Sequence, residues 1–339
     1  MEIEMLGTES LGVRGLSCFI KVGHRKILLD PGVALGFTRH GLHPHPVQAV
    51  IGDYVRKRIV EKWVEASDIV ISHFHGDHVP LYNANPFQLH LNMVKDKGTN
   101  KALWTKNWNH MTAKEKLRAE KLYQAFNGKW VIAEEAKDEV LEFSKPVPHG
   151  LSSSTKVLLT KIGDGDKVFV HMPDTQLVCD KAVSIVLSWK PSIVFAGGPP
   201  VYRWFLRKNM YKVLMEKAWR NAIKLSTHTD ILILDHHVMR SIEGAVWVEK
   251  LSLETGCTIL CAADFTYKPR IMLEAWRQVL YKKIPIPNNW HIRYAKGEIN
   301  MKPYIKIANK MLKELEQYRE KTLTLLDIEK LLDKILAKH

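Results

Sequence analysis

The sequence is poor in cysteine and in long apolar runs. It holds 4 cysteines among 339 residues, too few for a disulfide framework, which indicates a reducing compartment. No apolar run approaches the roughly 20 residues that a membrane-spanning helix needs. The first residues, 1–5, carry acidic side chains where a signal peptide needs basic ones. We therefore expect a cytoplasmic protein with no membrane partner.

Negative charge is also scarce. The chain has 36 Asp and Glu against 50 Lys and Arg, a formal net charge of +14. This excess favours an anionic substrate, with nucleic acid among the candidates. The basic residues gather at 95–121, about 203–220 and 268–293. Because a lysine-rich surface is also typical of thermophiles, the charge alone does not identify a partner.

What remains is the composition of a globular protein, with 46% hydrophobic and 25% charged residues. The pattern predicts strands at 14–22 and 25–30 around the turn Gly23-His24, a helix over 51–66 and a strand at 67–72. Later come a hairpin over 155–172 and strands at 192–196, 231–234 and 258–262, alternating with helical segments. This alternation predicts a layered α/β architecture.

The C-terminal residues 268–339 are helical in pattern. Apolar positions over 304–315 share one helix face, and Thr324 with Asp327 forms a capping signal before the last helix. We expect a helical extension packed on the main domain, 1–267. Its apolar faces can cover the chain's own core or a second copy, so a homo-oligomer through these helices is open.

Histidine is the abundant residue, with 16 copies, and four potential metal ligands lie together after the strand that ends at Ser72. In His73-x-His75-x-Asp77-His78, the two alternate histidines of an extended chain can chelate one ion. The chain then turns at Gly76, so that Asp77 and His78 can face a second ion. Imidazole and carboxylate suit zinc, and two ions about 3.5–4 Å apart can acidify one water. A solvated polar loop is the alternative, and so dense a run of ligand types disfavours it.

This segment resembles the HxHxDH motif of the metallo-β-lactamase fold, and the later motifs of that family follow in order. Asp30, before Pro31-Gly32, resembles its first aspartate, which supports the ligands. His149, Asp174 and His236 resemble its third, fourth and last motifs. The resemblance covers about residues 1–265. The blocks ESLGVRGLSCF, LLDPGVALG and GGPPVYR also resemble an uncharacterised archaeal branch of the family.

The resemblance implies an αββα four-layer sandwich, with a helical insertion near 79–128 and the helical extension. It implies two zinc ions, with manganese or iron as alternatives, held by seven side chains. The first ion would be bound by His73, His75 and His149, the second by Asp77, His78 and His236, and Asp174 would bridge them. Asp77 would also be catalytic, orienting the attacking water and accepting its proton.

The last ligand has a competitor next to it, because His237 follows His236 directly. Strand alternation would send only one of the two rings to the metal face. We favour His236, since Arg240 then follows four positions later, as in the tRNA 3′-processing members of the family. Asp264, at the end of another strand, is expected to orient a ligand.

Three residues are candidates for substrate binding. Arg14 precedes a strand that would end near the metal face, and its forked donors suit an anion. Tyr202 and Arg203 follow the glycine-rich turn Gly197-Gly198, which could form a pocket wall. His43 and His45 lie in the loop 33–50, where a solvated position is favoured over a place at the site's entrance.

The expected activity is metal-dependent hydrolysis. The diiron oxygen-reducing branch usually has Glu where His75 stands here, so redox chemistry is disfavoured. A phosphodiesterase is favoured by the positive charge. The alternatives are a lactonase or esterase of the same fold and, in another class, a non-catalytic binding protein.

Overall fold

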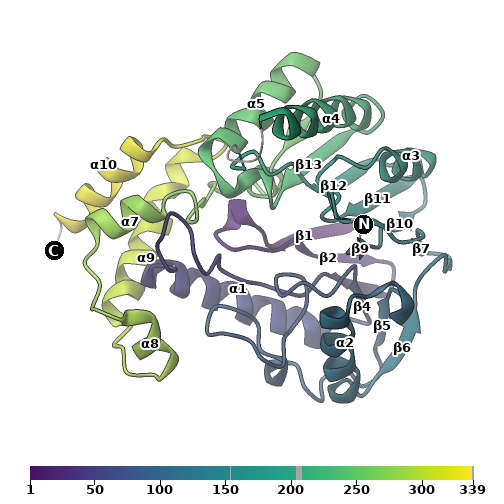
Figure 1. The fold of residues 1–339 in the computed structure, drawn as a ribbon, viewed down its shortest axis with the longest axis horizontal. Helices are drawn as coiled ribbons and strands as arrows, with labels where there is room; N and C mark the ends of the chain where they lie inside the picture. The colour runs from purple at the N-terminus through teal and green to yellow at the C-terminus, as the bar shows by residue number, and fades with distance from the viewer. Residues whose placement is uncertain (153, 204–207, 338–339) are drawn as a thin grey trace.

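Two six-stranded sheets face each other, and helices cover their outer sides (Figure 1). This computed structural model describes residues 1–152, 154–203 and 208–337. The first sheet has the order β1-β2-β3-β4-β5-β6. Its strands are β1 (Glu2–Gly7), β2 (Ser17–Val22), β3 (Arg25–Leu29), β4 (Asp68–Ile71), β5 (Ala102–Thr105) and β6 (Lys129–Ile132). β1 to β3 are antiparallel, and β3 to β6 run parallel.

The second sheet has the order β14-β13-β12-β11-β10-β7. Its strands are β7 (Leu141–Phe143), β10 (Thr160–Asp164), β11 (Lys167–Met172), β12 (Ile193–Gly197), β13 (Ile231–Asp235) and β14 (Ile259–Leu260). β11 to β14 are parallel, whereas β10 pairs antiparallel with both neighbours. A two-stranded ribbon of β8 (Val147–Pro148) and β9 (Lys156–Val157) lies beside the sheets.

The core follows the alternation of side chains along the strands. In β2, Cys18 and Ile20 are fully buried in the cluster that they share with strands of the second sheet. Phe19, between them, points the other way into the cluster beneath α1 (Pro46–Glu65). Because successive strand residues face opposite sides, one strand contributes to both layers. The predicted αββα sandwich is therefore present.

The outer helices lie on opposite sides of the sandwich (Figure 1). α1 and α2 (Ala113–Ala125) cover the first sheet, and α3 (Asp180–Ser188), α4 (described from Lys208 to Ser226) and α5 (Ile242–Thr255) cover the second. Residues 204–207 of the expected basic segment lie outside the described residues. Short helical turns complete these layers: η1 (Glu9–Leu11), η2 (Leu91–Met93), η3 (Trp108–His110), η4 (Val238–Arg240) and α6 (Ala262–Phe265).

The segment 79–128 is less helical than the expected insertion. It contains one α-helix, α2, and also β5, which pairs with β4 and β6 inside the first sheet. Likewise α1 begins at Pro46 rather than near residue 51, because buried His45 caps it. The His45 ring accepts a hydrogen bond from Val47 N, so His45 is not a solvated loop residue.

The C-terminal helices cover the chain's own core. They are α7 (Arg277–Lys283), α8 (Trp290–Ala295), α9 (Lys302–Leu315) and α10 (Leu325–Leu336), with η5 (Glu316–Tyr318) between the last two. Met311 and Leu332 from α9 and α10 are fully buried in the main core cluster. The predicted cap of α10, Thr324 with Asp327, is present. Among the described residues, no helix is both long and apolar enough to cross a membrane.

Candidate metal centre

The expected ligands converge where parallel strands end. Asp30 follows β3, the motif 73–78 follows β4, Asp174 follows β11 and His236 follows β13. Carboxyl ends of neighbouring parallel strands share one edge of a sheet, which is where open α/β folds place their sites. Asp30, Asp174 and His236 all have positive φ, at 42°, 39° and 57°. Such strained backbone is common at functional sites, where it re-aims a side chain as the strand ends.

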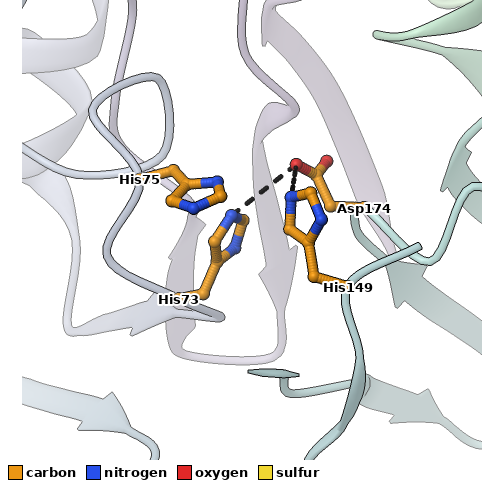
Figure 2. A group of neighbouring side chains, drawn as sticks. All are labelled: His73, His75, His149 and Asp174. Atoms are coloured by element: carbon orange, nitrogen blue, oxygen red, sulfur yellow. Dashed lines mark hydrogen bonds and ion pairs between the residues drawn. The ribbon is translucent and has the colours of Figure 1, made fainter. Parts of the chain in front are cut away.

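A first donor group contains three histidines and one aspartate. Ligand atoms of His73, His75, His149 and Asp174 all lie within 4.8 Å of one another. Figure 2 shows the three imidazoles turned toward each other, with the carboxylate beside them. The Nε2 of His149 is 2.9 Å from Asp174 Oδ2, and that of His73 is 3.6 Å from the same oxygen. These are the residues that the resemblance assigns to one ion and its bridge.

A second donor group lies directly beside the first. Ligand atoms of Asp77, His78 and His236 lie within 4.8 Å of one another. His236 Nε2 is 3.4 Å from His78 Nε2 and 3.7 Å from Asp77 Oδ2. Asp174 reaches this group too, with Oδ1 3.3 Å from His236 Nε2 and Oδ2 3.4 Å from His78 Nε2. Asp174 is thus placed between the two donor groups.

His237 also faces the cluster, contrary to the expectation that only one of the two neighbours would. Its Nε2 is 3.4 Å from Asp174 Oδ2, and it forms a donor group with Asp174 and His236. Strand alternation does not apply because β13 ends at Asp235 and His236 is left-handed. Both rings are therefore available as ligands.

Asp30 supports the second donor group from behind. Its carboxylate accepts hydrogen bonds from Ser72 N (2.7 Å), Ser72 Oγ (2.6 Å) and His78 Nδ1 (2.8 Å). The bond to His78 leaves Nε2 facing the cluster, as expected of a ligand whose other nitrogen is oriented by a carboxylate. Gly32 makes this approach possible, because a Cβ there would lie 2.2 Å from Val79 N.

Glu9 supports the opposite side, and sequence reasoning missed it. Its carboxylate accepts hydrogen bonds from His236 Nδ1 (2.8 Å) and Arg240 Nε (2.5 Å). All three side chains are buried. Nearby Asp235 accepts a hydrogen bond of 3.1 Å from Ser10 N and thereby fixes η1 against the end of β13. The sequence signal for Glu9 is weak, because it is an acidic residue in a stretch whose other residues are also buried.

The candidate substrate residues occupy three different environments. Arg14 is bound to Glu274 through two hydrogen bonds of 2.7 and 2.6 Å, so its fork is already paired within the chain. Tyr202 is half-buried and its hydroxyl accepts a bond of 3.2 Å from Arg240 Nη1. Arg203 is exposed. Of the three, Tyr202 is linked to the cluster, because Arg240 contacts both Tyr202 and His236.

Asp264 does not orient a ligand, contrary to expectation. Both of its oxygens accept hydrogen bonds of 2.9 Å from Arg270. It also caps the short helix α6 through the backbone of Cys261. The strand before it, β14, is only two residues long, so the chain turns into α6 and carries Asp264 into a structural ion pair.

Electrostatics within the cluster lower the pKa values of two imidazoles, His73 and His75, and of two carboxylates, Asp77 and Asp174. Burial lowers the pKa of His73, and it lowers that of His75 to about 4. Burial acts to raise the pKa of Asp77, but the charges of His78, His236 and Arg240 prevail and hold it below its usual value. The charges of the neighbouring histidines lower the pKa of Asp174 in the same way. Neutral imidazole and ionised carboxylate are the forms that bind metal.

The unmet bonding capacity of the cluster fits a metal. His73 Nε2 and both ring nitrogens of His237 are buried and make no hydrogen bond with the described residues. Buried polar atoms without partners are costly and rare in folded proteins. A divalent ion would satisfy several of these nitrogens at once, and the nitrogen and oxygen donor set is that of zinc sites. Asp77 and His149 keep 19% and 13% of their side chains exposed, which marks the open side.

Comparisons with solved structures return proteins of the metallo-β-lactamase fold. The metallo-β-lactamase fold protein YhfI of Bacillus subtilis matches with 10% identity and a TM-score of 0.44, over 76% of this chain and 95% of that one. Tm1679, described as a metal-dependent hydrolase of the β-lactamase superfamily, matches with 11% identity and the same TM-score, over 76% and 94%. The two-sheet architecture itself rests on the strand pairing described above. No family model matches the chain.

Curated relatives come from archaea. The UPF0282 protein of Methanosarcina mazei is 39% identical over 308 residues, covering 90% of this chain and 100% of the relative. That of Pyrococcus horikoshii is 34% identical over 296 residues, covering 83% and 93%. Identity at this level over nearly the whole of both chains exceeds what a shared fold alone requires. The chain belongs to the UPF0282 family.

Proposed function

We propose that the protein is a dinuclear metal-dependent hydrolase that cleaves a phosphodiester bond in a phosphate-containing substrate. The observation that carries this proposal is the convergence of two histidine and aspartate donor groups on Asp174, with buried imidazole nitrogens that make no hydrogen bond. A structural polar cluster would satisfy its own atoms. Here His73 Nε2 and His237 Nε2 lie near the Asp174 carboxylate and make no hydrogen bond with the described residues.

The two donor groups provide one place for each ion. His73, His75 and His149 would hold the first, Asp77, His78 and His236 the second, and Asp174 would touch both. His237 is a further ligand for either ion. Zinc suits this donor set best, and manganese or iron would also bind it. When bound, such ions supply positive charge that acidifies water and stabilises charge on the attacked oxygen.

Asp77 is the catalytic side chain in this proposal. It is partly exposed, it lies at the open side of the cluster, and the positive charges around it keep it ionised near neutral pH. It would therefore orient the attacking water and accept its proton. Arg240, with Nη2 3.7 Å from Asp77 Oδ2, holds this carboxylate in place from the buried side.

Guanidinium groups around the cluster favour phosphate over a neutral ester. Buried Arg240 lies beside His236 and Asp77. Arg118 of α2 donates to Phe74 O within the metal motif at 2.6 Å, and its charge acts on Asp77. Arginine is the side chain best suited to charged oxygens such as those of phosphate. A lactone or neutral ester offers such groups no charge to meet.

Metal content and hydrolysis of bis-p-nitrophenyl phosphate test the proposal. We expect about two ions per chain after loading with zinc or manganese, and turnover that His75→Ala abolishes. His24→Ala is the matched control, because His24 is exposed in the turn between β2 and β3. Binding of well under one ion per chain, or full activity in the His75 variant, would contradict the proposal.

A further inference from the structure

A cavity of about 450 Å³ is linked to the metal centre through the contacts of Tyr202 and Arg240. Its volume falls within the range of small-molecule sites. It is formed by three separate parts of the chain, namely the loop before α1, the turn after β12 with the start of α5, and the C-terminal extension. Its lining includes Arg39, Tyr202, Ser241, Glu243, Gln278 and Leu325.

Arg39 gives this cavity a cation. Its guanidinium lies over the ring of Tyr202, 4.7 Å from the ring centroid, and Nη2 donates to Arg240 O at 3.3 Å. Arg39 is half-buried and lines the cavity, so its charge acts on any group that occupies the cavity. A planar guanidinium held by stacking is suited to a carboxylate or phosphate oxygen.

The start of α5 adds donors to the same cavity. Ser241 is the N-cap, and Ile242 and Glu243 begin the helix. The amides of the first helical residues have no acceptor within the helix, and the helix dipole makes this end favourable for an anion. The exposed carboxylate of Glu243 acts in the opposite sense. The cavity thus contains one strong attraction and one weaker, solvent-screened repulsion for a negative group.

Two side chains connect this cavity to the metal centre. Tyr202 lines the cavity, and its hydroxyl accepts a bond from Arg240 Nη1 at 3.2 Å. Arg240 Nη2 is 3.1 Å from His236 Nε2. A substrate whose scissile bond lies at the metal donors can therefore reach the cavity only with a group some distance from that bond. Such a group interacts with Arg39 rather than with the metal.

We propose that this cavity binds a second anionic group of the substrate, so that the preferred substrate is a small phosphodiester carrying a further phosphate or carboxylate. This inference rests on the proposed function for the identity of the reacting bond. Arg39 is the residue that recognises the distal anion, and Tyr202 positions Arg39. Gln278 and Leu325 place the C-terminal extension in the wall of this cavity, which favours a compact molecule over a polymer.

Matched nucleotides separate the distal anion from the reacting group. Thymidine 3′,5′-bisphosphate and thymidine 5′-monophosphate differ only in the 3′-phosphate, and calorimetry on zinc-loaded protein measures both affinities without turnover. We expect the bisphosphate to bind the wild type about 10-fold more tightly, the size of one charged hydrogen bond. In Arg39→Gln the ratio should fall to about 1. Arg293→Gln, an exposed arginine on α8, should leave the ratio unchanged.

A second variant keeps the test valid if Arg39→Gln folds poorly. Glu243→Gln removes the opposing charge from an exposed position, and we expect it to raise the preference for the bisphosphate by about 2-fold, the usual scale for a screened surface charge. A wild type that binds both nucleotides equally, or an Arg39→Gln protein that keeps the full preference, would overturn this inference.

Hydrolysis of the two p-nitrophenyl 5′-esters of these nucleotides separates this inference from the proposed function. Cleavage of both esters at equal kcat/KM would overturn the distal site and leave the hydrolase intact. Cleavage of neither ester, with the binding preference retained, would overturn the hydrolase and leave the anion site standing.

Discussion

The ion pair of Lys106 and the cluster around Asp174 are both buried polar groups, but they differ in whether all of their polar atoms are hydrogen-bonded. Lys106 is fully buried, yet its amine donates to Glu115 Oε1 and to Lys156 O, both at 2.6 Å. Glu115 in turn caps α2. Around Asp174, by contrast, His73 Nε2 and both nitrogens of His237 make no hydrogen bond with the described residues. Burial alone therefore does not mark a site. The candidate site is distinguished by several buried ring nitrogens without hydrogen bonds that lie around one carboxylate.

The largest effect on metal binding and hydrolysis is expected when Asp174 loses its charge. Asp174→Asn keeps the size of the side chain but removes the carboxylate that lies between both donor groups. We expect metal content to fall below two ions per chain and hydrolysis of bis-p-nitrophenyl phosphate to drop on the order of 10³-fold, the scale of a lost electrostatic group in an active site. Asp166→Asn, in the exposed β10–β11 turn, is the control. Unchanged metal content in Asp174→Asn would mean that this carboxylate is not a ligand.

A substitution of Lys106 tests whether its buried ion pair contributes to stability and not to metal binding. Lys106→Met removes one partner of a buried ion pair and leaves the Glu115 carboxylate without its cation. We expect the free energy of unfolding to fall by about 3–5 kcal/mol, because that charge stays buried. Metal content of the folded fraction should not change. Urea unfolding followed by circular dichroism measures the first quantity. Loss of metal without loss of stability would contradict the distinction.

The smallest expected effect concerns His45, a buried histidine that meets its bonding needs within the chain. Its Nδ1 accepts from Val47 N and its Nε2 donates to Ile284 O at 3.3 Å. Burial lowers its pKa from 6.5 to about 3. Below pH 6.5 the imidazole of His45 binds a proton in the unfolded chain but stays neutral in the folded chain. The free energy of unfolding therefore falls as the pH falls. The loss amounts to roughly 2 kcal/mol between pH 7 and pH 5.

His45→Asn isolates this contribution, because asparagine also caps helices but does not titrate. Urea unfolding of metal-free protein at pH 7 and pH 5 compares the two chains, and the metal-site histidines titrate alike in both. We expect the wild type to lose more stability on acidification than the variant. Parallel losses would show that the His45 imidazole is protonated in the folded state.

Local patterns predicted much of the fold. The hairpin turn at Gly23-His24, the strand before the metal motif and the cap at Thr324 are set by neighbouring residues, and all are present. β5 was missed because its four residues lie in a basic segment whose spacing fits a helix. The helix start at Pro46 was missed because a histidine is an unusual cap, and its role depends on burial beneath the C-terminal extension.

The convergence of the donor residues and the support from Asp30 were predicted from order and spacing, but the support from Glu9 was not. Glu9 meets His236 and Arg240 from the opposite end of the chain, and no local pattern encodes such a contact. The expectation for Asp264 failed because a competing cation, Arg270, lies six residues further on. The side chain of His237 faces the cluster because the backbone of His236 is left-handed. The spacing of residues in the sequence does not reveal such a backbone conformation.

The contacts of η1 have a consequence for the order of events during synthesis. Glu9 binds Arg240, Arg14 binds Glu274, and Ser10 O accepts from Ile271 N at 2.7 Å. Residues 9–14 thus leave the ribosome more than two hundred residues before the partners that they contact. Long-range pairing of this kind slows folding. The donors of the motif 73–78 remain an incomplete set until then, so we expect metal to be acquired by the finished chain rather than by the growing one.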